Sequence, residues 1–90
     1  MQKQAVLTIY GKVQGVFFRE STRRRVKELN LTGWVRNEPD GTVRIVAEGE
    51  EKNLTDLIDW CKNSPDRVKV DHADAKWLAA TNQFSDFLIK

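Results

Sequence analysis

The sequence of 90 residues contains one cysteine, Cys61, and one histidine, His72, so it offers no internal disulfide and no Cys/His metal site. It has no apolar run of about 18 residues, the length that a membrane-spanning helix needs. It also has no apolar N-terminal segment of the kind that directs secretion. These absences argue against a membrane partner and predict a cytoplasmic protein.

An excess of charge of one sign is also missing, because 15 basic and 13 acidic residues leave a net charge of only +2. This mildly positive balance suits an anionic ligand but falls short of the strongly basic surface typical of nucleic-acid binding. A chain of this length has room for one domain, 1–90. Because the sequence begins with Met1 and ends on a predicted strand, we expect that domain to act on its own.

Apolar periodicity divides the chain into strands and helices. Strands are predicted at residues 4–13, 33–37, 42–47, 67–77 and 84–89, and helices at 18–29 and 52–62. In the first strand the alternation places Ala5, Leu7 and Ile9 on the core side. The Asp40-Gly41 pair predicts a tight turn between the second and third strands. A change of phase near Asp71 predicts a bulge in the fourth.

The order of these elements is β-α-β-β-α-β with an additional C-terminal strand. Each helix joins two strands through a crossover, and right-handed crossovers place both helices on the same face of the sheet. The expected fold is therefore a ferredoxin-like α/β sandwich of the α+β class, with two helices packed on one face of a mostly antiparallel sheet.

The segment from Gly11 to Arg19 joins the first strand to the first helix and is the strongest candidate for chemistry. Gly11 and Gly15 let the backbone turn tightly, and the amides at the start of a helix have no intrahelical acceptor. Arg19 adds a permanent positive charge. The spacing matches neither nucleotide-phosphate pattern, GxGxxG or GxxxxGK[ST]. Taken by itself, the segment indicates no more than an anion site.

Two motifs then make a family resemblance specific. Residues 11–19, Gly-Lys-Val-Gln-Gly-Val-Phe-Phe-Arg, and residues 33–43, Gly-Trp-Val-Arg-Asn-Glu-Pro-Asp-Gly-Thr-Val, resemble the two motifs of the acylphosphatase family. The similarity extends through Glu48-Gly49, Trp60, Pro65 and residues 87–89. Asn30 stands where many members have glycine, and Ser64 stands where glycine usually precedes the proline.

The resemblance implies a hydrolase that splits the carboxyl–phosphate bond of acyl phosphates into a carboxylate and inorganic phosphate. Arg19 is implied as the phosphate-binding arginine and Asn37 as the residue that orients the attacking water. The phosphoryl oxygens are then held by the backbone amides of Gln14, Gly15, Val16, Phe17 and Phe18. No metal or organic cofactor is required, and a monomer is expected. If the strand that ends at Asn37 lies beside the first strand, its amide faces the loop.

Other features receive simpler interpretations. Arg23-Arg24-Arg25 spreads around the helix axis, so we interpret it as a solvated surface that can steer anions rather than as a nucleic-acid stripe. His72 is expected on the surface of an edge strand, and Cys61 in the core.

Two other functions are compatible with the predicted fold. An RNA-binding module has the same element order, but the strand at 42–47 lacks the aromatic residues that stack on bases. The other alternative is a domain that binds acyl or carbamoyl phosphate groups without turnover.

Overall fold

The computed structural model describes residues 1–15, 17–63, 65 and 68–90. Its elements, in chain order, are β1 (Gln2–Lys12), α1 (Phe18–Glu28), β2 (Thr32–Asn37), β3 (Val43–Glu50), α2 (Glu51–Lys62), β4 (Lys69–Ala79) and β5 (Phe87–Ile89). The strands form one five-stranded sheet in the order β4-β1-β3-β2-β5. All neighbours are antiparallel except β2 and β5, which run parallel.

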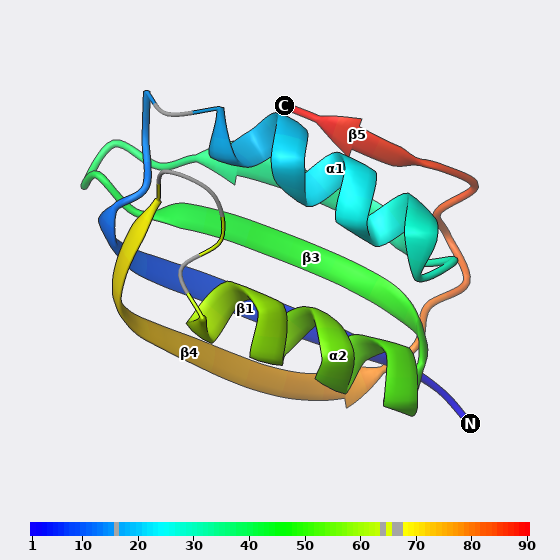
Figure 1. The fold of residues 1–90 in the computed structure, drawn as a ribbon. Coiled ribbons are helices and arrows are strands. Elements are labelled where there is room, and N and C mark those ends of the chain that lie inside the picture. The colour runs from blue at the N-terminus through cyan, green and yellow to red at the C-terminus, as the bar shows by residue number, and fades with distance from the viewer. Residues whose placement is uncertain (16, 64, 66–67) are drawn as a thin grey trace.

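Both helices cover the same face of the sheet, as Figure 1 shows. Helix α1 packs against β2 and β5, and α2 packs against β4, β1 and β3. This arrangement confirms the ferredoxin-like α/β sandwich that the sequence predicts.

The core lies between the sheet and the two helices. In β1 the predicted alternation holds, since Ala5, Leu7 and Ile9 are fully buried. Burying a leucine, isoleucine or phenylalanine side chain stabilises the fold by about 1.5–3 kcal/mol. The largest side chains in this layer are Phe18, Phe87, Leu7, Ile9, Ile45, Leu54 and Leu57.

The bulge predicted near Asp71 is present where β4 pairs with β1. Tyr10 pairs with His72 and the next residue, Gly11, pairs with Val70, so Asp71 is the additional residue on β4. The strand continues to Ala79, beyond the predicted end. Its predicted start at Arg67 lies outside the described residues, as do Asp66 and Ser64.

The predicted last strand, 84–89, is wrong at its start, because β5 begins at Phe87. The three residues of β5 pair only with Gly33, Trp34 and Val35 of β2. Just before them, the carbonyl of Asp86 accepts the Gly33 N–H at 2.9 Å, while the Asp86 side chain accepts the Phe87 N–H at 2.8 Å. The residues before Asp86 therefore extend past the first residue of β2, so among the described residues they have no strand to pair with.

Candidate active site

Three strand ends meet at one end of the sheet. β1 and β2 are both antiparallel to β3, and β5 is parallel to β2, so β1, β2 and β5 all point the same way. The strand of Asn37 does not lie directly beside β1, so the condition considered from the sequence is not met: β3 lies between the two strands. The register nevertheless puts Asn37 level with β1, since Val43 of β3 pairs with both Ile9 and Asn37. Asn37 thus lies at the end where β1 passes into the loop 11–19.

A pocket of about 350 Å³ opens at this end of the sheet. It is lined by Val13, Gly15, Phe17, Phe18, Arg19, Glu20, Asn37 and Ile89. The structure therefore brings Arg19 and Asn37 to one pocket, together with three of the five residues predicted to contribute amides. Of the other two, Val16 lies outside the described residues, and Gln14 is not among the lining residues.

Helix α1 begins at the pocket in a way that leaves amides free of helical bonds. Phe17 has left-handed backbone angles, φ 61° and ψ 22°, and its side chain is 78% exposed. Among the described residues, the first helical hydrogen bond runs from the Ser21 N–H to the Phe17 carbonyl at 3.0 Å. The amides of Phe18, Arg19 and Glu20 lie before this first donor and have no helical acceptor in the described part of the chain, and such amides favour an anion.

Arg19 is held by the residue that follows β5. Its Nη1 donates to the backbone oxygen of Lys90 at 3.1 Å, and the Lys90 N–H donates to the Val35 carbonyl at 2.8 Å. The side chain of Lys90 lies over the Trp34 ring, with Nζ 5.0 Å from the ring centroid. Through Lys90, these contacts link the arginine to the end of β5 and to β2.

Asn37 carries an unusual polar atom for a folded protein. Its Oδ1 is buried and has no hydrogen-bond partner among the residues that the structure describes. Buried side-chain oxygens are nearly always hydrogen-bonded to protein or water, so an unpaired one beside a pocket needs an explanation. An acceptor in this position is suited to a hydrogen bond from a small molecule, such as water, that enters the pocket.

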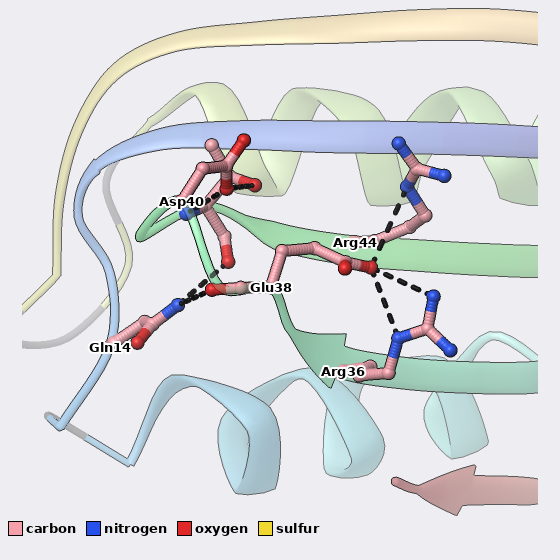
Figure 2. A network of polar contacts seen from close by, with 6 residues as sticks. Gln14, Arg36, Glu38, Asp40 and Arg44 are labelled. Atoms are coloured by element: carbon pink, nitrogen blue, oxygen red, sulfur yellow. Dashed lines mark hydrogen bonds and ion pairs between the residues drawn. The ribbon is translucent and has the colours of Figure 1, made fainter.

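Gln14 contacts the β2–β3 hairpin instead of the pocket (Figure 2). Its Nε2 donates to the carbonyls of Glu38 and Thr42, each at 2.9 Å. Between these two residues, Oδ1 of Asp40 accepts the hydroxyl and the N–H of Thr42 at 2.6 and 3.0 Å, and these bonds lower the pKa of Asp40. The loop is thus attached to an ordered turn.

Glu20 places a carboxylate beside Arg19 at the pocket. Nη2 of Arg23 donates to Glu20 at 2.9 Å, and this hydrogen bond lowers the pKa of the Glu20 carboxyl. Glu20 is therefore an ionised, paired group at neutral pH, which makes it unsuited to deliver a proton there.

The remaining candidates lie elsewhere, as the sequence predicts. His72 is on edge strand β4, where its Nε2 is 2.6 Å from Oδ1 of Asp74, and Cys61 is fully buried in α2. Within the described ranges, no group of three or more His, Cys, Asp or Glu side chains is placed to hold a metal ion. No helix in those ranges is long and apolar enough to cross a membrane.

Sequence reasoning missed two contributors to the site. Lys90 acts through its backbone oxygen, which no side-chain pattern can reveal. The side-chain role of Gln14 was also missed, although the Asp-Gly turn brings the carbonyls of residues 38 and 42 close together and so offers acceptors to a nearby amide.

Comparison with known proteins shows which family has this sequence pattern and this fold. The family model described as acylphosphatase matches residues 5–89. A curated acylphosphatase from Marinobacter nauticus is 54% identical over 81 residues, which span 90% of this chain and 88% of that protein. A solved acylphosphatase from Coxiella burnetii has a TM-score of 0.92 at 38% identity, covering 99% of this chain and 93% of the other. A solved acylphosphatase from Bacillus subtilis has a TM-score of 0.93 at 32% identity, covering 100% of this chain and 99% of the other.

The fold and these relatives define a small hydrolase built on a ferredoxin-like sandwich. The chain belongs to the acylphosphatase family.

Proposed function

We propose that the pocket at the ends of β1, β2 and β5 hydrolyses the carboxyl–phosphate bond of acyl phosphates, releasing a carboxylate and inorganic phosphate. The observation that carries this proposal is the presence of Arg19 and Asn37 on one pocket, where Oδ1 of Asn37 is buried without a partner among the described residues. One residue is suited to an anion and the other to a neutral hydrogen-bond donor.

The loop and Arg19 bind the phosphoryl group. Gly15, Phe17 and Phe18 line the pocket, and the amides at the start of α1 have no helical acceptor among the residues that the structure describes. By position in the motif, the backbone amides of Gln14 and Val16 belong to the same set, but Gln14 does not line the pocket and Val16 lies outside the described residues. The Arg19 guanidinium neutralises the charge that spreads over the equatorial oxygens in the transition state.

Asn37 orients the attacking water. Its Oδ1 accepts a hydrogen bond from the water, which turns a lone pair of the water oxygen toward phosphorus. The new O–P bond forms as the bond to the acyl oxygen breaks, and the electron pair of that bond leaves on the carboxylate. The water's proton passes to the phosphate product or to solvent.

This chemistry needs few groups. A carboxylate is a stable leaving anion, so no general acid has to protonate it. A loose transition state asks little nucleophilicity of the water, so its alignment matters more than its deprotonation. Preorganised donors and positioning then supply most of the acceleration. We therefore propose that no metal or organic cofactor takes part.

The test is release of phosphate from a synthetic acyl phosphate such as acetyl phosphate by the purified protein, with and without a chelator. We expect turnover that the chelator leaves unchanged. Turnover that disappears with the chelator would overturn the metal-independent mechanism. Stoichiometric binding without turnover would instead identify a domain that only recognises acyl phosphate groups.

Matched variants test the two residues. Arg19→Ala is expected to lower kcat by roughly 10²–10³, the scale for removing one donor at an oxyanion. Asn37→Ala removes the acceptor that aligns the water, and a misplaced reactant of this kind lowers kcat by about 10²-fold. Arg24→Ala removes the same charge from the exposed side of α1, and Asn63→Ala removes an exposed asparagine after α2, so both controls should keep full activity. Wild-type rates in both site variants would refute the proposed roles.

We further propose that residues 1–90 form a single cytoplasmic domain that works as a monomer without nucleic-acid or membrane partners. Sedimentation at micromolar concentration tests the monomer. A titration with single-stranded RNA at two salt concentrations tests the absence of nucleic-acid binding.

A further inference from the structure

The carboxylate of Glu38 joins two arginines that would otherwise repel. Arg36 of β2 and Arg44 of β3 are register partners, and like charges directly opposite each other destabilise a strand pair. Oε1 of Glu38 accepts from Nε and Nη2 of Arg36 at 3.0 and 2.9 Å, and Nε of Arg44 lies 3.9 Å away (Figure 2). The Glu38 side chain is only 18% exposed, against 43% and 45% for the arginines. The mostly buried carboxylate of Glu38 therefore offsets the positive charges of both Arg36 and Arg44.

The backbone of the same residue holds the loop. The Glu38 carbonyl accepts from Nε2 of Gln14 at 2.9 Å and from the Gly41 N–H at 3.1 Å. The Glu38 N–H donates to the Thr42 carbonyl at 2.8 Å, which is the other acceptor of Gln14. Glu38 thus connects the arginine pair to Gln14 through the turn.

Glu38 also follows Asn37 directly, although it does not line the pocket. Gln14 stands next to Gly15, which does line it. The contacts of the arginine pair therefore reach the pocket by two routes. One runs through Gln14 to the loop, and the other runs along the backbone to Asn37.

We propose that Glu38 is a positioning residue for this site: its arginine-held carboxylate orients the turn, and its carbonyl, through Gln14, fixes the distance between the loop and Asn37. The inference rests on the proposed acyl phosphate hydrolysis at that pocket. Without the carboxylate, Arg36 and Arg44 repel, the end of the hairpin shifts, and Gln14 loses its alignment with the two carbonyls. A displacement near 1 Å at a reacting centre is enough to lower a rate by about 10²-fold.

The first experiment is the kinetics of Glu38→Gln, which keeps the shape of the side chain and removes its charge. We expect kcat to fall by roughly 10-fold, because the loop still binds phosphate but is displaced from Asn37. For the same reason, inhibition by inorganic phosphate should stay within about threefold of wild type. Glu28→Gln removes an exposed carboxylate that pairs with Arg25 at 3.3 Å, and it should leave kcat unchanged. An unchanged kcat in Glu38→Gln would overturn the proposal.

A double-mutant cycle tests the route through Gln14. If Glu38 acts through Gln14, the double variant Gln14→Ala/Glu38→Gln should have nearly the kcat of Gln14→Ala alone. Losses that multiply would show that Glu38 acts independently, against the proposal. Arg36→Gln is the second variant should Glu38→Gln fold poorly. It removes the donor of both short bonds, so the Glu38 carboxylate loses its anchor on β2 and kcat should fall, but by less than in Glu38→Gln because no second cation is left to repel Arg44.

A measurement without substrate separates this inference from the proposed function. In NMR spectra, the side-chain amide of Gln14 and the backbone amide of Gly15 should shift in Glu38→Gln and stay in place in Glu28→Gln. Wild-type protein that releases no phosphate would contradict the hydrolytic function alone. Unshifted Gln14 and Gly15 signals in Glu38→Gln would contradict the positioning role alone.

Discussion

The side-chain amide of Gln4 donates a hydrogen bond of 2.7 Å to the carboxylate of Glu48, and the two residues are 8% and 4% exposed. The same carboxylate accepts the Thr81 hydroxyl at 2.7 Å and the N–H groups of Thr81 and Asn82 at 2.8 and 3.0 Å. A buried charge is tolerated when its oxygens are hydrogen-bonded in this way. Glu48 therefore links β1, β3 and the chain that follows β4.

We predict that Glu48→Gln lowers the free energy of unfolding by about 2–4 kcal/mol, because charge-assisted bonds are lost and an amide NH₂ faces other donors. Urea denaturation followed by tryptophan fluorescence measures the change. Glu51→Gln serves as the control, since it removes an exposed carboxylate that pairs only with Lys3 at 2.9 Å among the contacts found in the described residues. An equal loss in the two variants would contradict a special role for Glu48.

The same carboxylate predicts an acid dependence of stability. Burial raises the pKa of Glu48, but its hydrogen bonds from Thr81, Gln4 and Asn82 outweigh burial and leave the pKa below its ordinary value. A lowered folded-state pKa means that this stabilisation is present above the unfolded-state pKa and is lost as pH falls through the folded one. Denaturation from pH 7 to about 3 should show a shallower decline for Glu48→Gln than for wild type. Parallel curves would contradict the assignment.

Cys61 is predicted to be unreactive in the folded protein. It is fully buried in α2, and desolvation raises its pKa to about 12, so the nucleophilic thiolate is scarce at pH 8. A chromogenic disulfide reagent should react at once in denaturant and only at the rate of opening in native buffer. Rapid labelling of the native protein would show that the α2–sheet contact is looser than the structure indicates.

Two glycines near the loop should respond differently to alanine. At Gly11, with φ +129°, a Cβ atom would lie 2.2 Å from the Lys69 carbonyl oxygen and 2.8 Å from the Asp71 nitrogen. Gly15, with φ +76°, has no neighbour within 4 Å of that position among the described residues. We expect Gly11→Ala to lose about 3 kcal/mol or more and Gly15→Ala about 1 kcal/mol from backbone strain. Thermal unfolding compares them, and the reverse order would contradict the bulge geometry.

Local patterns were sufficient for most of the fold. The alternation of Ala5, Leu7 and Ile9 follows from one buried face, and the bulge at Asp71 follows from a change of phase in a single strand. The length of β5 was not predictable, because it depends on how much of β2 remains to pair with. The place of β3 between β1 and β2 is likewise a property of the whole sheet.

The residues at the motif positions of the site were predictable from the sequence. The contacts that hold these residues in place were less so. Arg19 and Asn37 share a pocket because parallel strands end together, which the βαβ order implies. The backbone oxygen of Lys90 and the carbonyls that hold Gln14 could not be foreseen, since any residue supplies the same atoms. The register of the hairpin reveals that Arg36 faces Arg44, and the side-chain contacts reveal that the Glu38 carboxylate pairs with both.

The bulge at Asp71 also affects the tendency of the molecule to associate with its own copies through an edge strand. β4 is an edge strand with mostly exposed residues, and such a strand can template the addition of a strand from another chain. An extra residue interrupts its regular spacing, and the charges of Asp71, Asp74 and Lys76 accompany it. The opposite edge, β5, offers only three residues. The irregularity that shapes the end of β1 therefore also protects the sheet against edge-to-edge aggregation.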